Sequence, residues 1–414
     1  MRVVIVNFED KAGGAARAAY RLHSALRSMG IESFMFVHRK QTDDPFVIGP
    51  TTIWQRFLMR FCYYLDAIPG KLLGKKGYFF NFSWVGAGFI MRKLRELNPD
   101  VVHLHWVLRG MMSPSQLNHF SGRVLWTCHD MWPFTGGCHY DEYCQQYESG
   151  CKACPMLKKP VFFNISRHLW RKKYHTYHAS KVHFLGVSRW MSECIQRSNM
   201  VPTEYVHCLP NPINTSLFSP VNKEVARAEI GINSSQQIIL FGAMDAFSEA
   251  RKGFQYLEQA LGCVNQSNIL LITFGAGENQ SRIGSLTCHH FGSIKDDHIM
   301  VMLYSAADIL VLPSLQENLA NTVMEAMACG TPCVAFDIGG NSDLITHKHN
   351  GYLAQPKDCE DLAKGMEWCL NPERLPALSS SAREHVLKHF EEKHVAKQYI
   401  DLYRAVSQYK NQSS

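Results

Sequence analysis

Two glutamates, Glu317 and Glu325, lie eight residues apart in the segment PSLQENLANTVMEAMACGTPCVAFDIGG. An apolar run at 309–312 just before it predicts a strand, and the small residues up to Gly330 predict a helix. A second strand-like run follows, so the order strand, loop, helix, strand is that of a nucleotide-binding α/β unit. Units of this kind bind phosphorylated ligands where the strand ends and the helix begins. The sequence therefore predicts two carboxylates and a helix N-terminus at one binding site.

Each residue of this site also has a structural explanation. Thr322 and Glu325 are spaced as in a capping box, in which the glutamate side chain stabilises the start of its own helix. Glu317 fits a solvated acid on a loop. Lys252 follows the loop SEAR at a predicted helix start, where it would supply a cation for an anionic ligand, and the alternative is an ordinary surface lysine.

A histidine and an aspartate follow a predicted strand in the first half of the chain. His129 lies in TCHDMW, just beyond the strand at 123–127. It can donate a hydrogen bond or carry a proton, and the alternative is a structural histidine bonded to the backbone. Asp130 is placed either to orient His129 or to cap the loop. His103 and His105 alternate with apolar residues on one strand face, which favours buried structural roles.

Four cysteines lie within seventeen residues of the same half. Cys138, Cys144, Cys151 and Cys154 belong to GGCHYDEYCQQYESGCKACP, which ends in C-x-x-C-P. Only the last pair has typical zinc spacing, and the cluster predicts a small metal knuckle with structural zinc. Paired disulfides, unligated thiols and an iron–sulfur cluster are the alternatives. Because the cluster follows His129 closely, we expect it to order that wall of the site.

The elements that position these residues form two alternating series of strands and helices. Apolar runs near 2–8, 31–37, 100–106, 123–127 and 182–187 are separated by helical stretches. Two prolines in the four residues 209–212 interrupt the pattern and predict a linker. A second series begins at residue 237, and the last ~30 residues, from Ser381, have helical periodicity. We expect an α/β protein with two doubly wound domains facing a central cleft, 1–212 and 213–394, and a helix at 395–414 that packs back on the first domain.

Composition predicts an ordinary soluble protein. The 414 residues are 46% hydrophobic and 19% charged, and no apolar run reaches the length of a membrane span. The first residues predict a buried strand and lack the apolar core of a signal peptide, so we expect a cytoplasmic protein whose fourteen cysteines are thiols or metal ligands.

Charge and aromatic residues are concentrated in the first half. Residues 1–215 hold 27 Lys and Arg against 14 Asp and Glu, whereas residues 216–414 hold 16 against 22. Within the basic half, residues 54–82 (WQRFLMRFCYYLDAIPGKLLGKKGYFFNF) mix aromatics with arginine and lysine, as an interfacial segment on an anionic membrane does. The alternative is a packed insertion with a solvated basic rim.

The second half carries a family resemblance. The segment YSAADILVLPSLQENLANTVMEAMACGTPCVAFDIGGNSDLI resembles the donor-binding signature of family-4 retaining glycosyltransferases of the GT-B fold. The similarity extends over most of the chain, through the glycine loop at Gly13 and Gly14, LGVSRWM, PNPIN, the pair Lys252-Gly253 and NGYLAQPKDCEDLA. The segment TCHDMWPFTGGC with its later cysteines is similar to a bacterial subgroup that builds exopolysaccharide or lipopolysaccharide.

The resemblance implies transfer of a sugar from a nucleotide-sugar to a hydroxyl of a glycan acceptor. In that reaction Glu325 holds the ribose, Glu317 contacts the donor sugar, Lys252 neutralises the diphosphate and His129 lies near the reacting groups, so catalytic roles fall on His129, Glu317 and Lys252. The implied donor-binding residues are Glu325, Glu317, Lys252, Arg251, Leu319, Ala320, Asn321, Thr322 and Gly275, and the implied acceptor and phosphate side holds Gly13, Gly14 and Asp130.

Two positions depart from the family pattern. Asn318-Leu319-Ala320 stands where the family often has glycine, an aromatic residue and glycine, which restricts the loop backbone. Ala243-Met244 stands where it usually has an arginine, so either Arg251 replaces that cation or one cation is sufficient.

The implied partners are a UDP- or GDP-sugar, a glycan acceptor linked to polyprenyl phosphate, and an anionic membrane surface. No cofactor is required for catalysis, and zinc would be structural. We expect a cytoplasmic protein held peripherally on the inner face of the plasma membrane. A nucleotide-sugar epimerase of similar fold and a catalytically inactive sugar-nucleotide or metal-binding protein are the alternatives. Nucleic acid is not an expected partner, because repeated zinc fingers and single-strand stacking motifs do not occur in the sequence.

Overall fold

The chain folds into two compact units, Met1–Pro212 with Lys393–Ser414, and Ile213–Glu392. The computed structural model describes residues 1–73, 80–152, 154–157, 164–232, 235–242, 249–264, 268–275, 282–283 and 286–408. The predicted boundary after residue 212 coincides with the first division, and the predicted boundary after residue 394 lies close to the second, which follows Glu392. The unit that contains the N-terminus is called the first unit below, and the other is called the second unit.

The first unit is built on a parallel sheet of seven described strands in the order β3-β2-β1-β4-β5-β6-β7. The central strands β1, β4, β5 and β6 are largely buried on both faces, as parallel strands are when helices cover the sheet, whereas the edge strand β7 is partly exposed. Their bounds are β1 Arg2–Glu9, β2 Glu32–Arg39, β3 Val47–Ile48, β4 Val101–Leu104, β5 Val124–Cys128, β6 His183–Gly186 and β7 Val206–Cys208.

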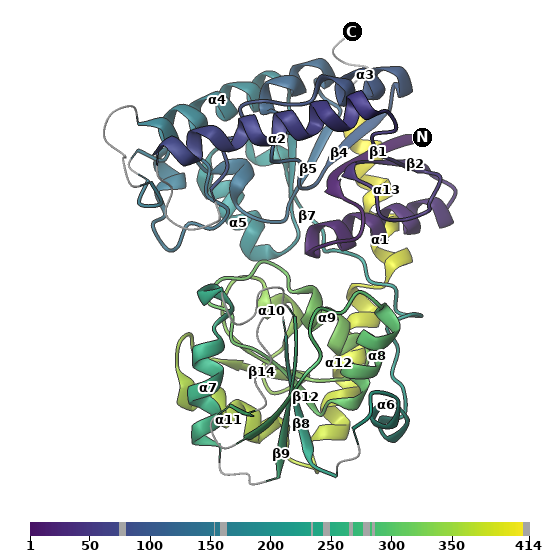
Figure 1. Cartoon of the computed structure of the whole chain (residues 1–414), viewed down its shortest axis with the longest axis vertical. Coiled ribbons are helices and arrows are strands. Elements are labelled where there is room, and N and C mark those ends of the chain that lie inside the picture. The colour runs from purple at the N-terminus through teal and green to yellow at the C-terminus, as the bar shows by residue number, and fades with distance from the viewer. Residues whose placement is uncertain are drawn as a thin grey trace. The chain divides into compact units, whose positions relative to one another are not determined.

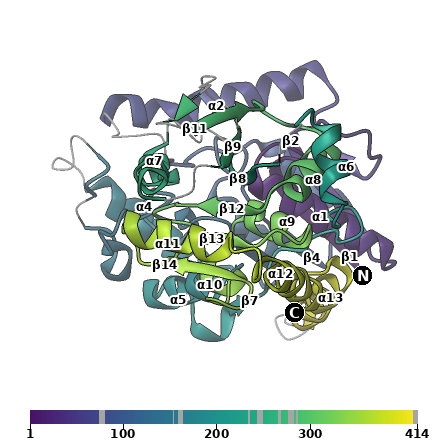
Figure 2. The same ribbon diagram turned by 90° about the horizontal axis from the view of Figure 1, so that it is seen from below.

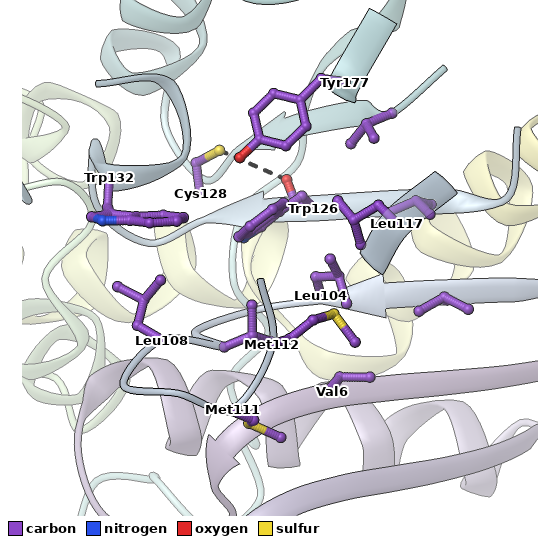
Figure 3. Close-up of a cluster of buried hydrophobic side chains, with 14 of the residues drawn as sticks. Val6, Leu104, Leu108, Met111, Met112, Leu117, Trp126, Cys128, Trp132 and Tyr177 are labelled. Atoms are coloured by element: carbon purple, nitrogen blue, oxygen red, sulfur yellow. Dashed lines mark hydrogen bonds between the residues drawn. The ribbon is translucent and has the colours of Figure 1, made fainter. Parts of the chain in front are cut away.

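Helices cover both faces of this sheet. On one face lie α2, α3 and α4, and on the other lie α1 and α13 (Figure 1). A core of Leu104, Trp126 and Trp132 with the methionines of the β4–β5 connection fills the first of these interfaces (Figure 3). The helix bounds in this unit are α1 Gly14–Ser28, α2 Ile53–Leu73, α3 Gly88–Leu97, α4 Ile165–Ala179, α5 Arg189–Ser198 and α13 Glu392–Gln408.

The second unit repeats this architecture. Its described strands have the order β10-β11-β9-β8-β12-β13-β14, and neighbouring strands pair in parallel except for β10 with β11. Because β8 and β12 are neighbours although β9 lies between them in sequence, the chain reverses its direction of winding there, and such switch points are ligand sites in open α/β sheets. The strand bounds are β8 Gln237–Gly242, β9 Ile269–Phe274, β10 Arg282–Ile283, β11 Leu286–His290, β12 Ile309–Leu312, β13 Cys333–Phe336 and β14 Gly351–Ala354.

In the second unit α7 and α11 pack on one face of the sheet, and α8, α9 and α12 lie on the other (Figures 1 and 2). Alternate strand residues such as Phe241 and Val311 meet Leu257 of α7 and Met366 of α11 in the core. The two doubly wound sheets predicted from the sequence are therefore confirmed. The helix bounds are α6 Lys223–Glu229, α7 Phe254–Cys263, α8 Asp297–Ala306, α9 Asn321–Ala328, α10 Asn341–Leu344, α11 Cys359–Cys369 and α12 Leu375–His389.

The start of α7 is fixed against the end of β12 by a glycine. Gly253 has a φ of 72°, and a Cβ atom built on it would lie 1.8 Å from the carbonyl oxygen of Pro313. Both the left-handed backbone and the close approach require glycine. This contact holds Lys252, the residue before Gly253, beside the loop that follows β12.

We predict that Gly253→Ala lowers the free energy of unfolding by about 3 kcal/mol, because the new methyl group must displace the backbone at Pro313. Gly262→Ala is the matched control, since Gly262 lies in α7 with nothing within 4 Å of its Cβ position. That control should be neutral or gain up to about 1 kcal/mol. Urea unfolding of both variants measures the difference, and equal stabilities would contradict the tight contact.

Candidate functional site

Glu317 is a buried carboxylate in the loop between β12 and α9. Its Oε2 atom accepts a hydrogen bond from the Lys252 ammonium at 2.8 Å, and the Arg251 guanidinium lies 3.6 Å away. The side chains of Glu317 and Lys252 are only 12% and 15% exposed. The structure thus brings together two of the predicted site residues, although they are far apart in the sequence.

The electrostatic balance at Glu317 favours the charged form. Burial by itself raises the pKa of this carboxyl, but the charges of Lys252 and Arg251 and the hydrogen bond from Lys252 outweigh burial and lower the pKa below its ordinary value. Glu317 is therefore ionised at neutral pH, and its oxygens act as hydrogen-bond acceptors.

Backbone contacts hold the Glu317 loop from two sides. Arg251 donates to the carbonyl of Gln316 at 2.7 Å, and the amide of Leu315 donates to the carbonyl of Arg251 at 2.8 Å. On the other side, a Cβ atom at Gly339 would lie 1.8 Å from the carbonyl oxygen of Glu317. Arg251 also pairs with Glu249 at 2.6 Å, so it already holds the loop as well as facing Glu317.

Glu325 lies on α9 and is 2% exposed. The Tyr304 hydroxyl of α8 donates to its Oε2 atom at 2.9 Å. The capping box expected from the sequence is wrong, because α9 begins at Asn321 after the N-cap Ala320, which makes no side-chain cap, and Thr322 lies inside the helix. Glu325 is the fifth helical residue, in the second turn and not in the first, so capping does not explain its presence.

Four of the remaining predicted donor residues lie at the start of the same helix. Leu319 and Ala320 are buried in the turn that leads into α9, and Asn321 and Thr322 are its first two residues. The first turn of α9 contains no acidic residue, so no charge within that turn opposes the attraction of its amide dipoles for an anion. Gly275 follows β9 with a φ of 123° and donates its amide to Gly292 at 2.7 Å. The Ala243-Met244 pair lies outside the described residues.

The first unit carries a chain of histidines at the ends of β4 and β5. His105 Nδ1 and His129 Nε2 are 2.7 Å apart, and His103 bonds the Tyr403 hydroxyl of α13 and Thr127, each at 2.7 Å. The prediction that His103 and His105 are buried is confirmed. The His105 side chain holds the His129 ring. Desolvation lowers the pKa of His129 to about 4, so it is neutral at pH 7.

Asp130 is held by three neighbouring groups. Its Oδ2 atom lies 2.6 Å from His139 Nδ1 and 3.1 Å from the indole nitrogen of Trp106, and its Oδ1 atom accepts from the amide of Trp132. These contacts fit the loop-capping alternative, and the alternative that Asp130 orients His129 stays a prediction. Burial raises the pKa of Asp130, but His139 and these donors outweigh burial and lower it.

The glycine loop and the cysteine cluster both lie in the first unit. Gly13 precedes α1 with a φ of 90°, and nothing lies within 4 Å of its Cβ position or that of Gly30. Gly14 is the first residue of α1. Cys138, Cys144, Cys151 and Cys154 are thiols that line one small cavity. Within the described chain, no three His, Cys, Asp or Glu side chains already stand at metal-binding positions.

Sequence patterns missed the partners that hold the predicted residues. Tyr304 of α8 lies twenty-one residues before Glu325 in sequence and donates to its carboxylate. His139 bonds both Asp130 and the side chain of Asn81. His139 was visible in the segment GGCHY, whereas Tyr304 looks like any apolar residue of a buried helix. Both residues position site groups through contacts that only the fold creates.

The second unit thus brings Lys252 and Glu317 together beside the start of the helix that carries Glu325. The first half matches the family Glycosyltransferase Family 4 over residues 12–217, and the second matches Glycosyl transferases group 1 over residues 235–372. Together the two matches cover most of the chain.

Curated relatives match part of the chain. An uncharacterized glycosyltransferase of Methanocaldococcus jannaschii is 26% identical over 243 residues, which are 55% of this chain and 61% of the relative. The N,N'-diacetylbacillosaminyl-diphospho-undecaprenol alpha-1,3-N-acetylgalactosaminyltransferase of Campylobacter jejuni is 29% identical over 204 residues, which are 47% of this chain and 52% of the relative. The chain thus spans about half the length of the curated relatives that it matches.

A solved structure matches the whole chain. Anabaena HepE in complex with UDP-glucose superposes with a TM-score of 0.66 at 15% identity, covering 98% of this chain and 100% of that one. This likeness shows the fold, which is GT-B. The chain is a GT-B protein of the glycosyltransferase family 4 type.

We predict that Lys252→Ala lowers the free energy of unfolding by about 3 kcal/mol, because it leaves the Glu317 carboxylate buried without its nearest cation. The charges of Lys252 and Arg251 hold the pKa of Glu317 below its ordinary value in the folded protein. The stability that this carboxylate contributes is therefore complete above that value and is lost as the pH falls through the folded pKa. Urea unfolding at a series of pH values measures both effects.

Two controls isolate the pair. Lys364→Ala removes an exposed lysine of α11 and should change stability by less than about 0.5 kcal/mol. In a Glu317→Gln background, Lys252→Ala should cost much less than in the native chain, because no buried charge remains. Equal costs in the two backgrounds would show that Lys252 and Glu317 do not interact energetically.

Proposed function

We propose that the protein is a retaining glycosyltransferase that moves a sugar from a nucleotide-sugar to a hydroxyl of a lipid-linked glycan. The observation that carries this proposal is the buried Lys252–Glu317 pair at the start of α9, with Glu325 on the same helix. The UDP-glucose bound to HepE supports a nucleotide-sugar donor, and the named activity of the Campylobacter relative supports a diphospho-undecaprenol-linked acceptor.

The donor roles follow from charge and position. Glu325 accepts hydrogen bonds from the ribose hydroxyls, and Tyr304 holds its carboxylate in one orientation. Glu317 accepts from hydroxyls of the donor sugar, and its ionised state makes those bonds charge-assisted. Both acids thereby fix the donor where its diphosphate faces the N-terminus of α9.

The reaction breaks the bond between the anomeric carbon and the diphosphate oxygen and forms a bond from that carbon to the acceptor oxygen. The acceptor proton passes to the departing diphosphate. Negative charge grows on the diphosphate in the transition state, and Lys252 with the amides at the start of α9 stabilises it. No cofactor takes part in these steps, so a strict requirement for Mg²⁺ would contradict the mechanism.

His129 acts on the acceptor side as a neutral hydrogen-bonding group. Its pKa of about 4 leaves it uncharged at pH 7, so it does not supply a positive charge. The contact with His105 fixes the ring. A neutral imidazole held in this way orients a hydroxyl group through one ring nitrogen.

A cationic cavity in the first unit fits a phosphate-bearing acceptor. Its volume is about 1130 Å³, and Phe8, His38 and Tyr63 form an aromatic part of its lining. The cations of the lining outnumber its two acids, Glu9 and Asp43, so the cavity favours an anion. These cations are Arg39, Lys40, Arg56, Arg60 and Arg109.

The helix α2 beside this cavity exposes an apolar face. Ile53 is 82% exposed, Trp54 80% and Leu72 71%, and Phe57, Phe61 and Ile68 continue the face at helical spacing. Arg56, Arg60 and Lys71 flank it. None of the described helices is long and apolar enough to cross a membrane. The exposed face and its cations suit a helix that lies in the headgroup region of an anionic membrane, as peripheral binding on the cytoplasmic face of the plasma membrane requires.

A function in bacterial exopolysaccharide or lipopolysaccharide synthesis is consistent with this donor, acceptor and membrane surface. A nucleotide-sugar epimerase would need no acceptor cavity and no exposed apolar helix. A protein that binds nucleotide-sugars without catalysis would hold the donor without consuming it. Release of free sugar or glycosylated product therefore separates these alternatives from the transferase.

We predict that the protein binds one of UDP, GDP or ADP and that Glu325→Gln weakens binding by about a hundredfold, because a charged partner of the ribose is lost. The glutamine still accepts the hydrogen bond from Tyr304, so the helix should be retained. Titration calorimetry with the three nucleotides measures the change.

Glu360→Gln is the matched control, because Glu360 is an exposed acid of α11. It should leave nucleotide affinity unchanged. If all three nucleotides fail to bind, or if Glu325→Gln binds as the native chain does, the donor assignment is wrong.

We predict that replacing Trp54, Phe57 and Phe61 together by serine reduces binding to vesicles that contain phosphatidylglycerol by at least about tenfold. Added salt should weaken binding of the native chain, because the flanking arginines are screened. Vesicle cosedimentation measures both effects.

The control replaces three exposed apolar residues of the second unit by serine, namely Leu217, Val225 and Leu387. These substitutions should leave vesicle binding unchanged. Equal loss in the two triple variants would indicate non-specific adhesion. No binding of the native chain at low salt would refute the membrane surface.

A further inference from the structure

Four cysteine side chains of the first unit face one enclosed space. Cys138, Cys144, Cys151 and Cys154 line a cavity of about 10 Å³ together with Gly136, Asp141, Gln146 and Tyr147. A volume of this size holds a single water-sized sphere. Cys138, Cys151 and Cys154 are buried, and Cys144 is half-buried. The four cysteines are spread over seventeen residues of largely irregular backbone, and the fold brings their side chains to one cavity.

One of the sulfurs accepts a backbone hydrogen bond, since the amide of Gly136 donates to Cys151 Sγ at 3.1 Å. A donor of this kind stabilises the thiolate, which is the form in which cysteine binds metal. The Thr135 hydroxyl donates to the carbonyl of Cys138 at 2.6 Å and so holds the backbone of a second cysteine. Burial raises the pKa of all four thiols, so a bound metal has to displace their protons.

The backbone around the cluster is held in unusual conformations. Glu142, Tyr143, Gln145 and Cys151 all have φ between 47° and 65°, and among the described residues 135–157 regular structure is limited to one short 3-10 turn at 146–149. Left-handed conformations of non-glycine residues persist only where other contacts hold them. A cross-link through the four sulfurs would supply that constraint.

We propose that Cys138, Cys144, Cys151 and Cys154 bind one Zn²⁺ ion as a tetrahedral four-thiolate site. The four thiols lose four protons to solvent, and four zinc–sulfur bonds form without any change in oxidation state. Because the sulfurs do not already stand at metal-binding positions, binding draws them inward around the cavity. Zinc suits sulfur ligands and tetrahedral geometry, whereas Mg²⁺ and Ca²⁺ require oxygen.

A buried cation lies beside the proposed site. Lys173 of α4 is 2% exposed, and its ammonium donates to the carbonyls of Trp132 and Thr135. A zinc ion with four thiolates has a net charge of minus two, which is costly in a buried place unless a cation is near. Lys173 offsets part of that charge, and the zinc site in turn gives a reason for burying a lysine here.

The zinc site would fix the loop that holds Asp130. The amide of Met131 donates to the carbonyl of His139 at 2.8 Å, and the His139 ring bonds Asp130. His139 directly follows Cys138. A metal bound to Cys138 therefore restrains the Asp130–His139 pair next to His129, so its role is to position this part of the first unit and not to react.

The test is metal analysis of the full chain purified with reductant and without chelator. We expect about one equivalent of zinc and, after exchange for Co²⁺, an intense thiolate-to-cobalt charge-transfer band. Zinc below about a tenth of an equivalent, together with no such band on titration with Co²⁺, would overturn the proposal. Stoichiometric iron with acid-labile sulfide, or two disulfides in the reduced preparation, would overturn it as well.

Matched variants separate the site from cysteine content. Cys151→Ser and Cys154→Ser should each lose the cobalt band, whereas Cys208→Ser, which alters an exposed cysteine of the same unit, should keep it. If a site variant does not fold, the zinc content and the cobalt band of the native chain still decide whether the chain binds the metal. A band that survives in both site variants would place the metal elsewhere.

Discussion

A buried carboxylate stays ionised only when a cation lies beside it. The loops around Glu317 in the second unit meet this requirement. Glu317 is almost fully buried, so its charge persists only because Lys252 lies 2.8 Å away and Arg251 stands close by. Gly253 brings Lys252 against the end of β12, and Gly339 lets the next loop close over the Glu317 backbone. These contacts together fix the loop between the end of β12 and the start of α9.

The first unit uses neutral groups where the second uses charges. His103 and His105 are buried and His129 is half-buried, and desolvation lowers the pKa of each, so they form hydrogen bonds without carrying charge. Tyr403 joins this group from α13, which ties the last helix to the strand that carries His103. Positive charge in this unit lies instead around the cavity beside α2. The proposed transferase therefore places fixed charge at the donor and neutral hydrogen-bonding groups beside the acceptor.

The sequence predicts those parts of the molecule that depend on local pattern. Continuous apolar runs identify the buried parallel strands, and the resemblance singled out Glu317, Glu325 and Lys252. The capping box failed because α9 starts at Asn321, one residue before Thr322, and pattern alone does not locate a helix start so closely. The partner of Asp130 was not predictable for another reason: His139 is nine residues away, and nothing in the spacing favours it over the adjacent His129. Tyr304, which holds Glu325, comes from a different helix and is found only in three dimensions.

In the proposed transferase, Lys252, Glu317 and Glu325 bind a nucleotide-sugar at the start of α9. A crystal structure of the protein with the nucleoside diphosphate that it prefers tests this binding mode. We expect the ribose hydroxyls at the Glu325 carboxylate and the diphosphate at Lys252 and the first amides of α9. A nucleotide bound in the second unit away from these residues, or bound only in the first unit, would contradict it.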